Sequence, residues 1–245
     1  MRGVGMRGMI DLHTHTFFSD GELGMAELVR RAEVAGYCVI GVSDHADSAN
    51  LDFLVPHVCL AARELSAVLP IKVLAGVELT HVPPALIATL VARARGLGAT
   101  YVVVHGETIV EPTAAGTNRA AIEAGVEFLA HPGLITEADA ARAAERGVYL
   151  EITTRRSHAY ANGHVLHMAR VTGAGLILNN DAHAPGDLVA RAMAEKIAAG
   201  AGMTPAELAA CFENSRRLAA LLHERATARA QYTQCAAPSG RDCNP

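Results

Sequence analysis

The sequence predicts an α/β fold in which parallel strands and covering helices form a (β/α) barrel. Short apolar segments alternate with helix-like segments, and strands that are apolar on both faces are typical of a parallel sheet between helices. Polar residues stand at the C-terminal end of nearly every expected strand, where a (β/α) barrel builds its active site. No glycine-rich phosphate loop joins an expected strand to a helix, which argues against a doubly wound nucleotide-binding fold.

Seven strands are expected, each followed by a helix, and a further helix closes the chain. The helices end or begin at familiar signals: Gly36 and Gly125 follow two of them, and Thr136 and Thr204 each precede an acidic residue at the third helical position. The expected strands are 9–12, 37–42, 71–79, 101–104, 127–130, 148–152 and 176–179. The expected helices are 25–35, 51–69, 84–97, 117–124, 136–146, 163–172, 187–199 and 204–223.

Length and composition indicate one globular domain. The 245 residues can bury a full core, and no linker interrupts 9–223, so we expect a single domain there with disordered ends at 1–8 and 226–245. No apolar run approaches the roughly 20 residues that span a bilayer, and the N-terminus does not resemble a signal peptide. We therefore expect no membrane association.

Cysteine usage and charge narrow the compartment and the partners. The five cysteines form no Cys-x-x-Cys pair and are odd in number, so a reducing cytoplasm is expected. The formal net charge is −4 with no long basic run, and nucleic-acid binding is therefore not expected, because it depends on neutralising phosphates. A small phosphorylated substrate needs only one or two arginines, and the sequence leaves the oligomeric state open.

The segment at 10–20 contains the first part of a candidate metal site. His13 and His15 lie two residues apart at the end of an expected strand, so their imidazoles point to the same face. Asp20 follows in a loop. Two nitrogen ligands and a carboxylate suit a divalent metal.

Later strand ends carry more residues of the same kind. Six histidines and three carboxylates come from six strands and share one rim of the predicted barrel. This set exceeds the four to six ligands that one zinc, manganese or iron ion takes, so it predicts two or three ions. The expected ligands are His13, His15, Asp20, His45, Glu78, His105, His131, Asp181 and His183.

These motifs, in this order, resemble the PHP (polymerase and histidinol phosphatase) family over about 9–223. The resemblance implies a distorted (β/α)7 barrel that holds a trinuclear cluster and hydrolyses phosphate esters. The motifs that carry it are His13-Thr14-His15, Ser19-Asp20-Gly21, Ser43-Asp44-His45, Gly76-Val77-Glu78, His105, His131-Pro132-Gly133 and Asp181-Ala182-His183.

The resemblance also implies how the ligands divide among three ions. One ion would take His13, His15, Glu78 and Asp181. A second would take Glu78 as a bridge together with His105 and His131, and a third would take Asp20, His45 and His183. In this scheme a metal-bridging hydroxide attacks phosphorus while the ions neutralise the developing charge.

Other residues are expected to act on the substrate. Glu78, Asp181 and His183 are expected to be catalytic as well as ligating, because a ligand carboxylate or imidazole could protonate the leaving alkoxide. Arg155 and Arg156 follow the strand at 148–152, and an arginine fork suits phosphate. His158, in the loop after them, is the remaining candidate for a substrate contact.

The predicted function is hydrolysis of a phosphate monoester of a small metabolite, for which histidinol phosphate is one candidate. A 3′–5′ exonuclease or phosphodiesterase of the PHP type is an alternative, but the 4% aromatic content and the lack of a basic stripe argue against it. A non-catalytic PHP module would be expected to lack ligands. A metal amidohydrolase also uses a His-x-His strand, but such sites usually include a bridging lysine, and no lysine stands near an expected strand end.

Overall fold

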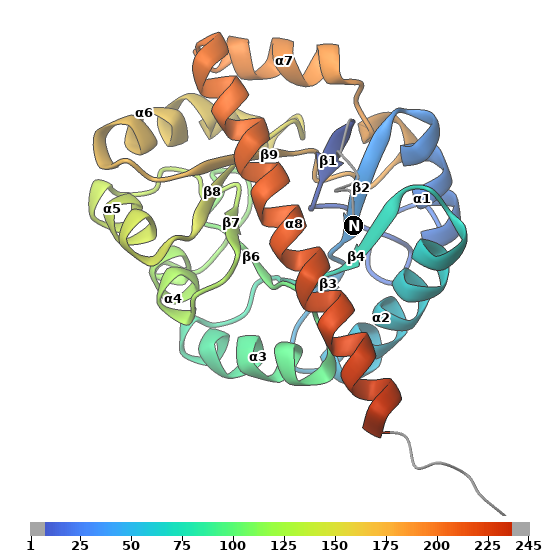
Figure 1. Cartoon of the computed structure of the whole chain (residues 1–245). Helices are drawn as coiled ribbons and strands as arrows, with labels where there is room; N and C mark the ends of the chain where they lie inside the picture. The colour runs from blue at the N-terminus through green and yellow to red at the C-terminus, as the bar shows by residue number, and fades with distance from the viewer. Residues whose placement is uncertain (1–7, 237–245) are drawn as a thin grey trace, which may run out of the picture.

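A computed structural model describes residues 8–236 as a mixed α/β domain with strictly parallel strand pairing. The strands form two sheets with the orders β1-β2-β4 and β3-β5-β6-β7-β8-β9. Helices α1 to α6 lie around the strands, and α8 crosses the molecule in front of them in the view of Figure 1. The strands are β1 Met9–Asp11, β2 Tyr37–Val42, β3 His45–Ala46, β4 Lys72–Ala75, β5 Glu78–Leu79, β6 Val103–His105, β7 Phe128–Ala130, β8 Tyr149–Thr153 and β9 Leu176–Asn179.

The helices agree closely with the expected ones over the middle of the chain. Thr136 caps α5 as predicted, and its side chain accepts a hydrogen bond from the backbone N of Asp139 at 3.1 Å. Thr204 and Glu207 form the predicted capping box before α8. The helices are α1 Met25–Val34, α2 Leu51–Val68, α3 Pro84–Leu97, α4 Thr117–Ala124, α5 Glu137–Arg146, α6 Asn162–Thr172, α7 Arg191–Gly200 and α8 Pro205–Ala236.

One expected strand is interrupted. The segment 71–79 is not continuous but forms β4 and β5, with Gly76 and Val77 between them. Tyr101 explains the break, because its ring lies against Gly76 so closely that a Cβ there would be 2.2 Å from the ring. The Tyr101 hydroxyl donates a hydrogen bond to the carbonyl of Leu12 at 2.8 Å. A buried aromatic side chain thus takes the room that a regular strand would need.

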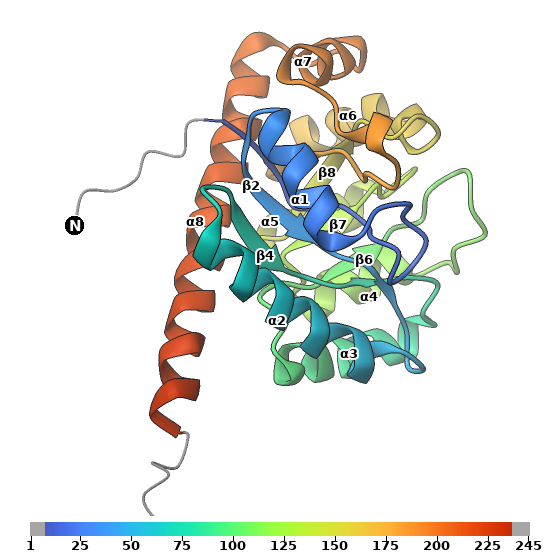
Figure 2. The same cartoon turned by 90° about the vertical axis from the view of Figure 1, so that its right-hand side faces the viewer.

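Two apolar layers hold the strands. Residues on one strand face pack against the surrounding helices in the larger core. Residues on the other face meet each other and α8 in a second, smaller cluster, whose buried members are Ile10, Leu12, Val39, Leu74, Tyr101, Val103, Phe128, Ala130, Ile177, Leu218, Ala219 and Leu222. We call this second group the inner cluster. Figure 2 shows α8 on one side of the strands and long connecting loops on the opposite side. The inner cluster therefore lies between α8 and the polar strand ends.

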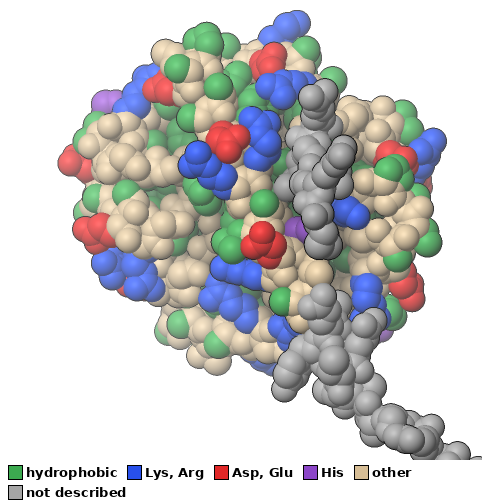
Figure 3. Space-filling model, viewed as in Figure 1, with side chains coloured by type: hydrophobic (Ala, Val, Ile, Leu, Met, Phe, Trp, Pro, Cys, Tyr) green, Lys and Arg blue, Asp and Glu red, His purple; other side chains and the backbone are tan. Residues whose placement is uncertain are grey.

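The expectation of disorder from residue 226 onward is wrong for 226–236, where α8 continues to Ala236. This stretch contains neither glycine nor proline and is rich in alanine, which favours a helix. Ion pairs and hydrogen bonds also hold α8 to α3 and its surroundings. Arg225 pairs with Glu127 at 2.8 Å, and Arg229 donates to the carbonyls of Arg95 and Gly96. Figure 3 shows Lys and Arg side chains gathered on this face. The other end segments, 1–7 and 237–245, lie outside the described residues.

The predictions about membranes and disulfides concern the whole chain, and the structure bears on part of it. Along 8–236, no helix combines the length and apolar character needed to cross a bilayer. Within the same range Cys38, Cys59 and Cys211 are free thiols. Both observations agree with the composition of the chain.

Candidate metal centre

The nine predicted ligands converge at the C-terminal ends of the strands. His13 and His15 follow β1, His45 begins β3, and Glu78 begins β5. Three later strands carry further members of the set at their C-terminal ends. His105 ends β6, His131 follows β7, and Asp181 and His183 follow β9. A pocket of about 190 Å³ opens above them, and it is lined by Asp20, His45, Thr80, His81, His105, Glu111, His131, Arg155, His158, Asp181 and His183.

The deepest ligands form an inner group of His13, His15, Glu78 and Asp181, all buried. Glu78 Oε2 lies 3.3 Å from His13 Nε2 and 3.6 Å from His15 Nε2. Asp181 Oδ1 lies 3.6 Å and 3.2 Å from the same two nitrogens. The structure therefore brings together the four residues that the family resemblance assigned to one ion.

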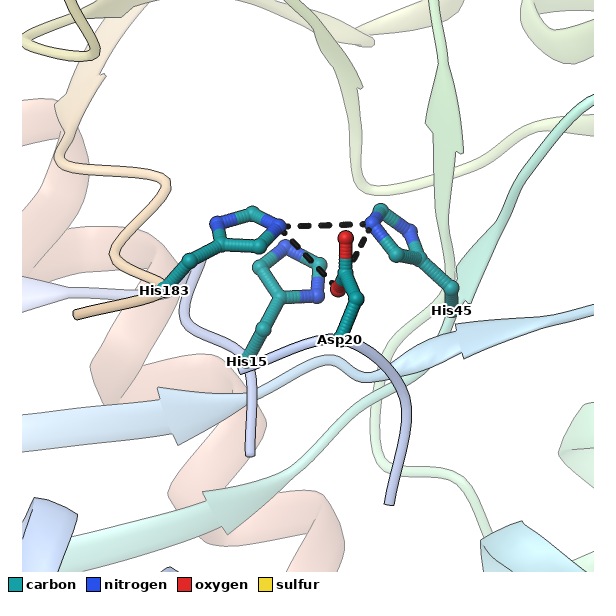
Figure 4. A group of neighbouring side chains, drawn as sticks. All are labelled: His15, Asp20, His45 and His183. Atoms are coloured by element: carbon teal, nitrogen blue, oxygen red, sulfur yellow. Dashed lines mark hydrogen bonds and ion pairs between the residues drawn. The ribbon is translucent and has the colours of Figure 1, made fainter. Parts of the chain in front are cut away.

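A second, more exposed group lies at one edge of the pocket, where Asp20, His45 and His183 meet as predicted. Asp20 Oδ1 lies 3.3 Å from His45 Nε2 and 3.2 Å from His183 Nε2. Figure 4 shows the Asp20 carboxylate between the two imidazoles, with His15 beside them. His15 belongs to this group by distance as well, so it lies between two groups of ligand atoms.

The third group differs from the prediction. His105 and His131 come together as expected, but His158 joins them, and the three ring nitrogens lie within 4.8 Å of one another. His158 stacks on His131 with ring centroids 4.1 Å apart. His158 thus lies among the possible ligand atoms, and its expected contact with substrate stays a prediction. Glu78 still reaches this group, because its Oε1 lies 3.7 Å from His131 Nε2.

Hydrogen bonds fix which nitrogen of several histidines faces the centre of the site. The Nδ1 atoms of His13, His105 and His183 lie 2.8–3.1 Å from oxygens of Glu151, Gly106 and Asp181 that can only accept. Nδ1 must therefore carry the proton in each ring, and the Nε2 lone pair is left free to bind a metal. The three Nε2 atoms belong to the three groups described above.

Several of these buried polar atoms have no hydrogen-bond partner among the described residues. They include His13 Nε2, both nitrogens of His15, both oxygens of Glu78 and Asp181 Oδ1. Buried polar groups are costly when they are unpaired, and this group brings carboxylate oxygens and imidazole nitrogens together without hydrogen bonds. A divalent cation satisfies such a set, because carboxylate oxygens and one nitrogen of each neutral imidazole are donors that zinc, manganese or iron accepts. The residues present therefore fit the predicted metal ions.

Burial and neighbouring charges shift the pKa values of the metal-free site strongly. Burial raises the pKa of Asp181 to about 7, with the negative charge of Glu78 acting in the same direction. Burial also opposes ionisation of Glu78, but the positive charges of His13 and His45 outweigh it and lower the pKa of this carboxyl. The pKa values of His15 and His131 are lowered by burial and by the imidazoles around them. The site thus favours unprotonated imidazoles at these two ligands.

Backbone strain concentrates at the same place. Among the described residues other than glycine, three have a positive φ, namely His81 at 52°, His131 at 24° and Asp181 at 53°. All three line the pocket. Histidine and aspartate adopt the left-handed region more readily than most residues, but three such residues around one pocket indicate that the surroundings impose it, as commonly happens at functional sites. His81 therefore lies with the other residues of the site.

Two carboxylates that flank ligands in the sequence support loops rather than ligand rings. Asp44 accepts hydrogen bonds from Thr16 and from the Ser19 hydroxyl, the latter at 2.7 Å. It thereby holds the turn that presents Asp20. Glu107 accepts from the backbone N–H groups of Gly116 and Asn118 and closes the base of the β6–α4 loop.

Sequence reasoning missed Glu151, which lies in β8 and is fully buried. Its carboxylate accepts hydrogen bonds from His13 Nδ1 at 2.8 Å, from the backbone N of His131 at 2.9 Å and from Asn179 Nδ2 at 2.9 Å. It thus orients His13 and positions His131, both ligands. A carboxylate inside a buried strand was the available signal, because such a group is rarely buried without a partner.

We expect Glu151→Gln to weaken metal binding about 10- to 100-fold, the usual effect of losing the partner of a ligating histidine. All three groups that contact this carboxylate donate, so an amide must turn its NH2 group toward at least one of them. Competition with a chromogenic chelator measures the effect. The matched control is Glu22→Gln, which removes an exposed carboxylate from the loop after β1. Equal metal affinities of the two variants would contradict the assigned role.

The two arginines predicted to bind substrate point to different places. Arg155 lines the pocket, and its Nη1 donates to the carbonyl of Asp181 at 3.2 Å. Its Nε lies 3.8 Å from Asp181 Oδ2, and its side chain is 29% exposed. Arg156 is exposed and does not line the pocket. Of the two predicted arginines, Arg155 is thus the one that the structure places at the pocket, and a substrate contact for either stays a prediction.

Comparison with known proteins agrees with this site. A model of the PHP domain matches residues 11–122, which include the ligands from His13 to His105. The chain is also 47% identical over 200 residues to an uncharacterized protein of Methanocaldococcus jannaschii, a match that covers 81% of this chain and 92% of the relative. The chain belongs to the PHP family. His131, Asp181 and His183 lie beyond the matched range, and the structure places them in the groups described above.

Solved structures share the fold of this PHP protein at low sequence identity. Histidinol phosphate phosphatase of Lactococcus lactis, solved with Zn, L-histidinol and phosphate, has a TM-score of 0.54 and 17% identity, with 80% of this chain and 94% of that chain covered. Ochratoxinase of A. niger has a TM-score of 0.58 and 15% identity, with 87% and 71% covered. An isopropylaminohydrolase of Burkholderia multivorans has a TM-score of 0.54 and 15% identity, with 87% and 74% covered. These likenesses show the fold alone.

Proposed function

We propose that this PHP protein is a metal-dependent phosphoesterase that hydrolyses a phosphate monoester of a small metabolite. The observation that carries the proposal is the convergence of three groups of ligand atoms beneath one pocket with an arginine on its wall. A volume of about 190 Å³ suits a phosphate group and a short substrate chain. Histidinol phosphate is one candidate, because a structural neighbour in the comparison is a phosphatase for that ester.

In the proposed reaction, different side chains bind the ions, connect the groups of ligands and carry the proton. The three groups hold two or three divalent ions, with zinc, manganese or iron suited to the imidazole and carboxylate donors. When bound, such ions supply Lewis acidity, which activates water and neutralises charge on the phosphate. Glu78 and Asp181 connect the groups, because each contacts histidines from more than one of them. Asp181 and His183 are the proposed carriers of the proton that the leaving alkoxide receives.

The same proposal includes a closed barrel of seven strands. β3 continues the line of β2, and β5 continues that of β4, so nine short strands correspond to seven longer ones. Beyond β1 and β9, Thr14 and Ala182 form a parallel bridge, with hydrogen bonds from His15 N to Ala182 O at 2.8 Å and from Ala182 N to His13 O at 3.3 Å. These hydrogen bonds support a barrel that closes between β1 and β9, at the place where the proposed metal ligands lie.

We expect Arg155→Met to raise KM for a phosphate ester about 10- to 100-fold with a smaller change in kcat, because a charged hydrogen bond to phosphate contributes about 1.5–3 kcal/mol. Arg156→Met is the matched control, since it removes the same charge from the neighbouring exposed position. Steady-state kinetics with p-nitrophenyl phosphate gives both constants. Equal effects of the two substitutions would show that Arg155 has no special contact with the substrate.

The decisive test pairs metal content with hydrolysis. Protein purified without chelator is analysed for metal per chain and assayed with p-nitrophenyl phosphate. Two or three ions and metal-dependent turnover support the phosphoesterase, and the next step is a screen of phosphorylated metabolites. Metal without turnover points instead to an amide or diester, as in the amidohydrolases that share the fold. Of the two lysines, Lys72 begins β4 and Lys196 lies in α7, so neither can bridge metals in the amidohydrolase manner.

A further inference from the structure

A glutamate outside the predicted ligand set reaches into the metal centre from a loop. Glu111 lies in the β6–α4 loop, six residues beyond His105. Its Oε2 lies 3.1 Å from His105 Nε2 and 3.2 Å from His81 Nε2, and its Oε1 lies 3.4 Å from His158 Nε2. Three imidazoles from three different loops or strand ends therefore surround one carboxylate.

These distances are those of ligands that share an ion. Donor atoms bound about 2.1 Å from a tetrahedral or octahedral ion lie about 3.0–3.4 Å from each other. His105 keeps its proton on Nδ1, which faces the carbonyl of Gly106, so its Nε2 offers a lone pair toward Glu111. His105 belongs to two groups of ligand atoms, one with His131 and His158 and one with His81 and Glu111. Glu111 therefore brings a carboxylate to the edge of the third group, where its Oε1 lies 3.4 Å from His158 Nε2.

The loop that carries Glu111 is held at its base by hydrogen bonds, whereas its tip is held to the rest of the protein through side chains. Glu107 holds the base through Gly116 and Asn118. At the tip, the side chains of Ile109 and Val110 are 51% and 40% exposed. Within the described residues, the backbone hydrogen bonds of 109–115 join this tip only to itself and to the start of α4. Segments with so few outside contacts open at low cost in free energy.

We propose that Glu111 is a displaceable ligand of the ion held by His105, His131 and His158, and that it leaves when a phosphate group binds. Carboxylate and phosphate are both oxyanions that bind the same cation, and Glu111 occupies the wall of the pocket into which the substrate must come. His81 is a positioning residue, because its Nε2 contacts the same carboxylate oxygen as His105 Nε2 does. The inference rests on the proposed function and adds to it a carboxylate that phosphate must displace before it binds the ion.

The experiment compares Glu111→Gln with the wild type and with Glu22→Gln. Each protein is titrated with Mn²⁺ against a chelator, and inorganic phosphate binding is then measured by calorimetry at saturating Mn²⁺. Glu111→Gln is expected to bind one ion at least about tenfold more weakly and phosphate several-fold more tightly, because the competing carboxylate is gone. His81→Ala is expected to shift both constants in the same directions by a smaller factor.

Each result bears on the proposal. Unchanged Mn²⁺ affinity in Glu111→Gln would overturn the ligand role while leaving the phosphoesterase intact. Weaker Mn²⁺ binding with unchanged or weaker phosphate binding would overturn displacement and leave Glu111 as a permanent ligand. A wild-type protein that binds neither Mn²⁺, Zn²⁺ nor Fe²⁺ would overturn both this inference and the proposed function.

Discussion

Glu78→Gln is expected to lower kcat/KM by roughly a thousandfold and to remove at least one ion per chain. A thousandfold loss corresponds to about 4 kcal/mol of transition-state stabilisation. The effect is large because this carboxylate contacts four histidines. Its oxygens lie 3.3 Å from His13, 3.6 Å from His15, 2.8 Å from His45 and 3.7 Å from His131. An amide keeps the shape of the side chain but loses the charge on which several ligands converge.

Metal content and kinetics measured on the same preparation test this prediction. Glu22→Gln again provides the control for removal of one negative charge at this end of the molecule. Circular dichroism establishes that the variant is folded. A Glu78→Gln protein with its full complement of ions and activity within tenfold of wild type would show that the ligand groups have been assigned wrongly.

Asp181→Asn is expected to stabilise the metal-free protein above pH 7 while abolishing most activity. In the metal-free fold, burial raises the pKa of Asp181 to about 7, above its ordinary value of 3.8. The native state therefore holds this proton to higher pH than the unfolded chain does. The contribution of Asp181 to stability is present in full below about pH 4 and is lost as the pH rises to 7.

The expected gain at pH 8 is at most about 4 kcal/mol, the free-energy equivalent of the difference between these two pKa values. Asparagine resembles the protonated carboxyl and tolerates the left-handed backbone of this position, where φ is 53°. Urea unfolding with chelator at several pH values measures the effect, and the gain should shrink steadily from pH 8 to pH 5. With saturating metal the order should reverse, because only the carboxylate binds the ion. A metal-free variant less stable than wild type at pH 8 would refute the argument.

The sequence predicted most of the ligands because parallel strands bring their C-terminal ends to one place. His13 and His15 follow from strand alternation, and His131 and His183 from their positions just beyond β7 and β9. The grouping of the ligands, in contrast, came from family resemblance. The structure confirms that the residues expected at each of the first two groups are neighbours.

Sequence reasoning found neither Glu111 nor the place of His158 among the ligand atoms, because neither residue lies on a strand. His158 reaches its group through the short helical turn His158–Ala161, and Glu111 through an irregular loop. Irregular loops have no repeat from which a side-chain direction can be read. The interruption between β4 and β5 has a different cause, because it depends on Tyr101, which is distant in sequence from Gly41 and Gly76 but fills the space that both leave.

The contact of α8 with the first strands determines at which stage of its synthesis the chain can complete its fold. Leu218, Ala219 and Leu222 complete the inner cluster with Ile10 and Leu12, and Leu12 directly precedes the proposed ligand His13. The strand residues are synthesised long before α8, the helix that covers them. Until α8 has been synthesised, the nascent chain therefore exposes an incomplete apolar surface that can aggregate. The protein therefore acquires its final shape only after α8 has been synthesised. Truncation ahead of residue 218 should convert a soluble product into aggregates, although every residue of the metal centre would still be present.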